Sequence, residues 1–397
     1  MAAVEEILSQ HSVSIIDLVQ ALVEHAHSLR ASDIHIDPTA DAVRVRLRVD
    51  GVLQEKFILP KAIHSEVISR VKVLSWLRTD EHQAAQDGRF RVVSESAMPI
   101  DVRVSITPTY YGENAVLRLL SDMPQHYTLS SLGFSVADEA KVLKALRRPH
   151  GMILATGPTG SGKTTTLYTL LKILNTKEVS IVTIEDPIEY AVSNITQIQI
   201  QPKTGLTFAA GLRSILRQDP NIIMVGEIRD AETAGIAINT ALTGHVLLST
   251  LHTSDAATTL PRLFDMGIDP YLVASTVSVA IGQRLLRTIC PACKQPHELS
   301  LPEQEALQEI VAPTSTIFFQ GAGCGACDGT GYAGRIGINE VLVVDSVVRN
   351  AILTRASAAR IQEIAIQNGM TTMFQDGLHK ATQGLTSVAE LLRVMQT

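Results

Sequence analysis

Aromatic residues and basic charge are both scarce in this chain of 397 residues. Phe, Trp and Tyr make up 4% of the sequence, and 34 Lys and Arg stand against 40 Asp and Glu, a formal net charge of −6. Proteins that bind a nucleic-acid backbone usually carry a basic excess, and those that stack bases need aromatic side chains. The composition therefore disfavours a nucleic-acid-binding protein. A hydrophobic content of 45% excludes intrinsic disorder for the bulk of the chain, whose length suggests two or three domains.

Long hydrophobic runs are missing as well. The longest uncharged stretch near the middle, residues 270–283, is shorter than the roughly 20 apolar residues that a membrane-spanning helix needs. Near the start, Glu5 and Glu6 stand where a secretory signal peptide carries basic residues, and no apolar segment follows them. These features predict a cytoplasmic protein.

Cysteine is rare too, and the four cysteines form two C-x-x-C pairs, Cys290 with Cys293 and Cys324 with Cys327. In a reducing compartment, such pairs are typical of metal sites rather than of disulfides. Four thiolates complete a tetrahedral Zn²⁺ site and leave no position for a reactive water, so we predict a structural zinc ion. Buried free thiols and a redox pair are the alternatives.

Hydrophobic periodicity divides the chain into two main parts. In the first ~120 residues, a mixed α+β pattern, residues 42–49 and 100–106 alternate strictly, which predicts strands, and Asp50-Gly51 predicts a hairpin turn. The polar segment 121–133 is a candidate linker. Beyond it, strands alternate with helices, which predicts an α/β domain with a largely parallel sheet. The expected strands are residues 152–156, 180–185, 221–226 and 245–250.

A glycine-rich loop follows the first of these strands. Residues 157–164 match G-x-x-x-x-G-K-[ST], a pattern that arises by chance in roughly one or two such chains per hundred. Backbone N–H groups of this loop surround phosphate oxygens, the lysine (Lys163) reaches the β- and γ-phosphates, and the hydroxyl (Thr164) ligates Mg²⁺. The predicted nucleotide-binding residues are Gly157, Pro158, Thr159, Gly160, Ser161, Gly162, Lys163, Thr164 and Thr165.

Acidic residues end two of the other predicted strands. Glu227 follows the apolar segment 222–226, and we predict that it activates or positions the attacking water; the alternative is an ordinary glutamate at a strand end. Glu185 ends the segment 180–185, and because the carboxyl ends of parallel strands gather ligands, we predict that Glu185 also takes part in ATP hydrolysis. His245, at the third strand, is a candidate sensor of the γ-phosphate, although lone histidines are more often structural.

Several longer motifs resemble those of one family, the ATPases of type II secretion and type IV pilus assembly (the GspE/PilB-like group). The P-loop corresponds to the family's Walker A motif, and the resemblance extends over nearly the whole chain. The other matching segments are residues 31–36, 46–51, 86–89, 112–113, 184–189 (similar to the family's "Asp box"), 212–230 (similar to its Walker B region) and 243–253 (similar to its "His box").

This resemblance implies a fold, an assembly and further site residues. It implies a homo-hexameric ring in which nucleotide binds between a RecA-like domain and a smaller domain. It also implies that Arg103 and Arg118 reach the phosphates from the smaller domain, although a solvated arginine face is the alternative. The implied parts are a PAS-like α+β domain (1–120), the RecA-like P-loop domain (134–288), a tetracysteine subdomain (289–340) and a C-terminal helical region (341–397).

The residues and the resemblance together predict a motor that hydrolyses Mg²⁺-ATP and drives pilin or pseudopilin assembly through an inner-membrane platform protein. Association with the membrane is then peripheral, through partners, and no nucleic acid is expected. The tetracysteine motif is frequent in the family's assembly ATPases and absent from its retraction ATPases, which favours assembly. The alternatives are a retraction ATPase, a nucleic-acid motor and a nucleotide-switched scaffold.

Overall fold

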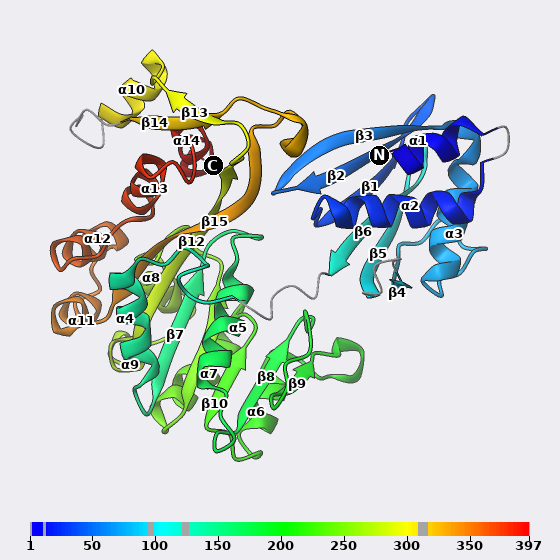
Figure 1. The fold of residues 1–397 in the computed structure, drawn as a ribbon. Coiled ribbons are helices and arrows are strands. Elements are labelled where there is room, and N and C mark those ends of the chain that lie inside the picture. Colours follow the sequence, from blue (N-terminus) through cyan, green and yellow to red (C-terminus); the bar gives the residue numbers. More distant parts are fainter. Residues whose placement is uncertain (1, 11–12, 94–98, 121–126, 309–316, 397) are drawn as a thin grey trace. The chain divides into compact units, whose positions relative to one another are not determined.

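The computed structural model describes the chain except for residues 1, 11–12, 94–98, 121–126, 309–316 and 397. The chain forms two compact units, Met1–Gln125 and His126–Thr397 (Figure 1). Their division falls in the predicted linker 121–133. Of that linker, residues 121–126 lie outside the described residues, and residues 127–133 consist mainly of turns.

The first unit is an antiparallel sheet with helices on one face (Figure 1). Its strand order is β3-β2-β1-β6-β5-β4, and every neighbouring pair is antiparallel. Its elements are α1 (Ala2–Ser9), α2 (Ile15–Ser28), β1 (Asp33–Pro38), β2 (Ala42–Val49), β3 (Val52–Pro60), η1 (Lys61–Ile63), α3 (His64–Leu74), β4 (Gln86–Val93), β5 (Pro99–Thr109) and β6 (Gly112–Leu120).

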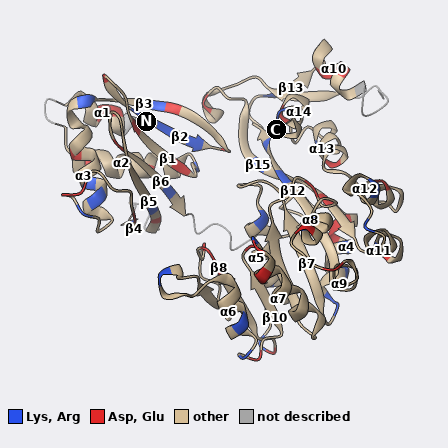
Figure 2. Cartoon of the chain, turned by 180° about the vertical axis from the view of Figure 1, so that it is seen from behind, with Lys and Arg blue, Asp and Glu red and all other residues tan. Residues whose placement is uncertain are grey.

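The alternation in β2 sorts its side chains between two faces of this sheet. Val43, Val45 and Leu47 are buried in one core with α2 and α3, and the alternation of a strand places the intervening arginines on the opposite face. Figure 2 marks the Lys and Arg positions of the first unit in blue. The predicted hairpin between β2 and β3 is confirmed. Asp50 and Gly51 both have positive φ (49° and 85°), as a two-residue turn that matches the twist of the strands requires.

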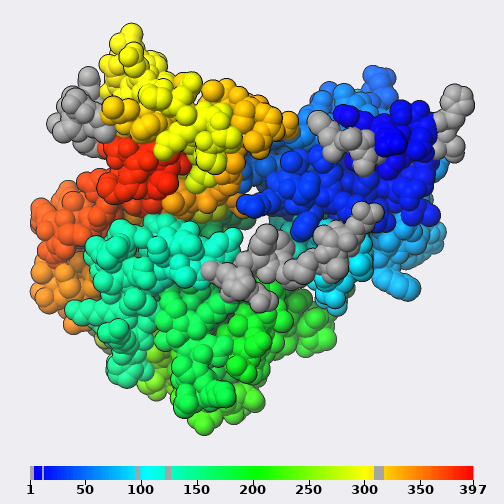
Figure 3. Space-filling model, viewed as in Figure 1, coloured from blue at the N-terminus to red at the C-terminus, as the bar shows by residue number. Residues whose placement is uncertain are grey.

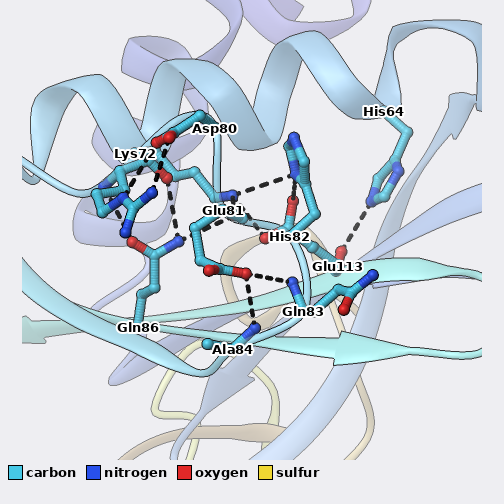
Figure 4. Close-up of polar contacts among 10 residues, drawn as sticks. His64, Lys72, Asp80, Glu81, His82, Gln83, Ala84, Gln86 and Glu113 are labelled. Atoms are coloured by element: carbon cyan, nitrogen blue, oxygen red, sulfur yellow. Dashed lines mark hydrogen bonds and ion pairs between the residues drawn. The ribbon is translucent and has the colours of Figure 1, made fainter.

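A buried ion pair joins α3 to the strands of the first unit (Figure 4). The Lys72 ammonium has no exposed side-chain surface and contacts Glu113 at 2.6 Å; it also donates to the carbonyl oxygen of Glu81 at 2.5 Å. The second carboxylate oxygen of Glu113 contacts Nδ1 of His82 at 2.8 Å. Removing one partner of such a pair costs about 3–5 kcal/mol, so this contact fixes the position of the 80–86 loop beside α3.

The second unit is built on a seven-stranded sheet of order β15-β12-β7-β11-β10-β8-β9. The strands from β12 to β9 are parallel, and β15 runs antiparallel at the edge. The strands and 3-10 helices are β7 (Gly151–Thr156), β8 (Ile181–Glu185), β9 (Thr196–Gln199), η3 (Pro202–Thr204), β10 (Ile222–Val225), β11 (Val246–Leu251), β12 (Val277–Ile289), β13 (Lys294–His297), β14 (Phe318–Gly321), η4 (Gly325–Cys327) and β15 (Tyr332–Val343).

Helices cover both faces of this parallel sheet, as its apolar strands require. Alternate residues of β10 enter two cores: Ile223 and Val225 pack in one, and Ile222 and Met224 in the other. The helices are α4 (Val136–Leu146), α5 (Lys163–Leu174), α6 (Phe208–Ile215), α7 (Ala231–Leu242), α8 (Thr259–Asp265), α9 (Pro270–Thr276), α10 (Leu301–Gln308), α11 (Ser346–Leu353), α12 (Ala358–Gln367), α13 (Met373–Thr382) and α14 (Val388–Met395).

The cysteine-bearing segment is inserted between two strands of the same sheet. β12 and β15 pair with each other, and β12 also pairs with β7, so the residues on either side of the insertion belong to the main sheet. The boundary predicted between residues 340 and 341 therefore falls inside β15. None of the helices in the described part of the chain combines the length and the apolar character that a membrane crossing needs.

Candidate functional site

The loop between β7 and α5 has the geometry of a phosphate-binding loop. Gly157 has φ +140°, and a Cβ at this position would lie 2.2 Å from the carbonyl oxygen of Gln283, so only glycine fits against β12. Gly162 caps α5 in a left-handed conformation, and the helix begins at Lys163. The positive end of α5 therefore faces the loop, which favours an anion there.

Lys163 is the buried cation of this loop. Its Nζ donates to the carbonyl oxygens of Gly157 at 2.7 Å and Pro158 at 2.9 Å. Burial lowers the pKa of Lys163, and the carboxylate of Glu227 opposes that shift. The structure thus brings Lys163 and Glu227 within electrostatic range of each other. The neighbouring Thr164 is exposed, with a hydroxyl oxygen of the type that Mg²⁺ prefers.

Glu227 lies just beyond β10 and is held by two cationic or polar neighbours. Its side chain is 12% exposed; Oε1 contacts Arg229 at 2.5 Å, and Oε2 contacts Nε2 of His252 at 3.1 Å. One strand, β11, separates β10 from the strand that leads into the P-loop, and His252 follows β11 directly. Glu227 and His252 therefore meet at the carboxyl edge of the sheet, where the P-loop also lies.

Glu185 has the surroundings of a structural acid. It is 2% exposed, and its oxygens accept hydrogen bonds from Tyr168, from Thr183 at 2.5 Å and from Gln197 at 3.2 Å. Burial raises the pKa of Glu185, although these hydrogen bonds oppose the rise. Burial also raises the pKa of the Tyr168 hydroxyl, and the neighbouring Glu185 adds to the rise. The Glu185 carboxylate is thus occupied by side chains that brace α5 against β8.

His245 lies at the opposite edge of the sheet from the P-loop. It precedes β11, whose first residue pairs with Gly151 at the start of β7, and its Nδ1 lies 3.2 Å from the carbonyl oxygen of Thr240. Parallel strands present their two ends to opposite edges, so His245 is not brought to the phosphate-binding loop of its own chain. His252, at the far end of the same strand, is the histidine that contacts Glu227.

We therefore expect the two histidines to differ in their effect on turnover. His252→Ala removes a partner that orients the Glu227 carboxylate, and kcat for ATP should fall by at least about 10-fold. His245→Ala, the matched substitution at the other end of β11, should leave kcat within about twofold of wild type. Steady-state ATPase assays on both variants test this ranking, and the reverse ranking would contradict it.

Arg103 and Arg118 are neighbours on the sheet of the first unit. The two residues lie opposite each other on the adjacent strands β5 and β6. Nε of Arg118 contacts the Asp33 carboxylate at 3.0 Å, and 60% of the Arg118 side chain is exposed. On its other side, Arg103 lies opposite Arg89 of the adjacent strand β4. These arginines thus form a row on the face of the sheet opposite the helices, which leaves a role in nucleotide binding as a prediction.

The four cysteines meet in one cluster, with every sulfur within 4.8 Å of the others. Three of the Sγ–Sγ distances are 4.0 Å for Cys290 and Cys324, 3.8 Å for Cys293 and Cys327, and 3.7 Å for Cys324 and Cys327. Tetrahedral zinc with bonds of about 2.3 Å requires separations of about 3.8 Å, so these three distances fit a shared Zn²⁺. The space-filling view shows the segment that carries Cys290 and Cys293 (yellow) against the C-terminal helices (red) (Figure 3).

The ionisation of the thiols agrees with a site for a cation. Burial and the hydrogen bonds that the Cys293 thiol donates to the other three sulfurs raise the pKa of Cys293 to about 12. Burial also acts to raise the pKa of Cys327, but hydrogen bonds, chiefly from the N–H groups of Cys324 and Gly331, outweigh it and lower the pKa to about 6. The thiolate form is thus favoured at Cys327 and disfavoured at Cys293, where a bound cation would offset the charge.

Residues 9–393 match the family described as Type II/IV secretion system protein. The chain belongs to this family. It is 46% identical over 383 residues to the type II secretion system protein E of Xanthomonas campestris pv. campestris, 45% over 381 residues to the type IV pilus assembly ATPase PilB of Thermus thermophilus, and 43% over 386 residues to the type II secretion system ATPase E of Vibrio cholerae. The resemblance drawn from the motifs is confirmed.

These alignments cover 94–97% of this chain but less of the relatives: 67% of the Xanthomonas protein, 42% of the Thermus protein and 76% of the Vibrio protein. Among solved structures, the chain is similar to the Legionella pneumophila ATPase DotB, with a TM-score of 0.71 at 23% identity over 97% of both chains. It is also similar to the pilus retraction motor PilT with bound ADP, with a TM-score of 0.63 at 26% identity over 94% of this chain and 96% of PilT. The predicted α/β fold with a P-loop core is confirmed.

Proposed function

We propose that this chain is the ATP-hydrolysing motor of a type II secretion or type IV pilus assembly system. The observation that carries the proposal is a phosphate-binding loop with a buried Lys163 at the same edge of the sheet as Glu227, in a chain more than 40% identical to ATPases of both systems. A P-loop lysine and a carboxylate that positions the attacking water are recurring parts of enzymes that transfer a phosphoryl group to water.

Each residue of the site has a distinct role in this proposal. The backbone N–H groups of the 157–165 loop, which Pro158 does not supply, and the Lys163 ammonium bind the phosphates of ATP and balance their charge. Glu227 orients the attacking water and accepts its proton, and His252 and Arg229 hold the carboxylate in place. The Thr164 hydroxyl would hold Mg²⁺, which supplies charge neutralisation at the phosphates when bound.

The proposal also includes an assembly and its partners. The assembly would be a homo-hexamer in which Arg103 and Arg118 reach the nucleotide from the smaller unit. ATP turnover would then depend on contacts between the units of the ring. The cargo would be pilins or pseudopilins, moved through an inner-membrane platform protein. In this scheme the motor works at the cytoplasmic face of the membrane, through its partners.

The cysteine cluster favours assembly over retraction within this proposal. Zn²⁺ bound by four thiolates is structural, and here it would fix the segment inserted between β12 and β15. A gene deletion separates the two directions of work: loss of secretion or of pili fits an assembly motor, whereas excess pili fit a retraction motor. ATP hydrolysis that depends on Lys163 is the direct test of the enzyme activity itself.

A further inference from the structure

Glu340 is a buried acid for which the nucleotide site has no evident use. It lies on β15, is 2% exposed and accepts two backbone hydrogen bonds, from the N–H of Ala256 at 2.7 Å and of Met373 at 3.3 Å. Burial raises the pKa of Glu340, and both N–H groups oppose that rise. Burying a carboxylate is costly, so its presence between two elements distant in sequence calls for a reason.

The Glu340 side chain has space because the residue that faces it on β12 is glycine. Glu340 pairs with Gly282 of β12, and a Cβ on Gly282 would lie 2.7 Å from Oε1 of Glu340 and 3.0 Å from the nitrogen of Ala256. On its other side, Gly282 pairs with Thr156, the residue just before the P-loop. The carboxylate therefore lies over Gly282 and reaches the loop that follows β11.

That loop, residues 252–256, carries two contacts of the nucleotide site. His252 contacts Glu227 at 3.1 Å. Thr253 is joined to Thr156: the two hydroxyl oxygens lie 2.5 Å apart, and the N–H of Thr253 donates to the Thr156 hydroxyl at 3.0 Å. Ala256, the residue that donates to Glu340, lies three residues beyond Thr253 and four beyond His252 in the same loop.

The other partner of Glu340 is the N-terminus of a C-terminal helix. Met373 is the first residue of α13, and the partial positive charge at a helix N-terminus favours a carboxylate. α13 is itself anchored, because Lys380 donates to the carbonyl oxygen of Gly133 at 2.6 Å and pairs with Asp376. Glu340 thus has a fixed helix on one side and the 252–256 loop on the other.

We propose that Glu340 is a positioning residue for ATP turnover, which holds the 252–256 loop against α13 and thereby sets His252 against Glu227. This inference rests on the proposed ATPase function. It predicts that Glu340 affects the chemical step more than nucleotide binding, since its contacts lead to the Glu227 side of the site through His252.

The test compares Glu340→Ala and Glu340→Gln with wild type in steady-state ATPase and nucleotide-binding assays. Glu340→Ala loses both acceptors, and kcat should fall about 5- to 10-fold while the Kd for a fluorescent ATP analogue changes less than about threefold. Glu340→Gln still accepts from Ala256 and should keep an intermediate kcat. If the alanine variant fails to fold, the glutamine variant alone carries the test.

A buried glutamate elsewhere in the same unit supplies the matched control. Glu390 is 1% exposed and pairs with Arg287 and Arg393, so Glu390→Gln should lower thermal stability while leaving kcat per folded chain unchanged. Combining Glu340→Ala with His252→Ala isolates the proposed route, because the Glu340 substitution should then lower kcat by less than about twofold further.

Several outcomes would overturn the inference. One is a wild-type kcat in both Glu340 variants. Another is a double variant whose fold-loss in kcat equals the product of the two single losses. The third is a fall in kcat that matches the fall in the fraction of folded protein. Absence of ATP hydrolysis in the wild-type protein would instead refute the proposed function, so the two failures are distinguishable.

Discussion

Glu227→Gln is expected to bind ATP with close to wild-type affinity and to lose about 10²- to 10³-fold in kcat. The substitution keeps the size of the side chain but removes the charge that accepts a proton from water, a contribution typical of a general base. The carboxylate is mostly buried and held by Arg229 and His252, so bulk water is a poor substitute for it. Single-turnover hydrolysis and binding of a fluorescent ATP analogue measure the two quantities separately.

An exposed glutamate in the same unit serves as the control for Glu227. Glu178 lies on the surface near the start of β8, and Glu178→Gln should leave both binding and kcat unchanged. Wild-type turnover in Glu227→Gln would remove this residue from the mechanism. A parallel loss of ATP binding would mean that Glu227 serves mainly to shape the P-loop.

Loss of the cysteine cluster is expected to have the second large effect, on stability rather than chemistry. The purified protein should contain one zinc ion per chain, and Cys324→Ser should lower the zinc content to near zero. Structural zinc sites supply about 10–16 kcal/mol of binding free energy in isolated peptides. Even a fraction of this loss should lower the Tm of the second unit by about 10 °C or more.

Zinc content and thiol titration distinguish the metal site from its alternatives. A metal chelator should reproduce the destabilisation in the wild-type protein, and added Zn²⁺ should reverse it. Thr330→Ala, beside the cluster but without a sulfur, should retain the metal. A wild-type protein without zinc that shows four free thiols, or a disulfide, would contradict the assignment.

The sequence predicts best those strands whose hydrophobic pattern follows directly from which of their faces are buried. β2 alternates because one of its faces packs against helices. β7, β8, β10 and β11 are largely apolar and buried along their whole length because both faces of the sheet are covered. The P-loop can be recognised from its residues because phosphate binding requires lysine at position 163 and glycines in the loop, and at position 157 the packing against β12 also requires glycine.

Features that depend on pairing between distant residues, such as β12 and the contacts of Glu340, cannot be predicted from local sequence patterns. β12 follows α9 without a turn signal and runs through Gln283 into charged residues, so its strand character depends on pairing with β7 and β15. The contacts of Glu340 join residues 84 and 33 positions apart, and no local pattern could have indicated them.

The histidine assignment illustrates the same limit on a smaller scale. His245 and His252 stand at the two ends of one strand, and the parallel direction of β11 and β7 decides which end shares an edge with the P-loop. Glu185 ends β8 at the carboxyl edge of the sheet, as the sequence predicts. The direction of its side chain, however, depends on Tyr168 of α5 and Gln197 of β9. Strand ends could be predicted from the sequence, whereas side-chain partners could not.

The measurement that tests the central claim most directly is the steady-state ATPase rate per chain against protein concentration, with Mg²⁺, for wild type and Lys163→Ala. We predict a rate that rises with concentration as a ring forms and that vanishes in Lys163→Ala, because Lys163 is the cation buried in the phosphate-binding loop. A rate that is unchanged in Lys163→Ala, or no hydrolysis at any concentration of wild-type protein, would contradict the account.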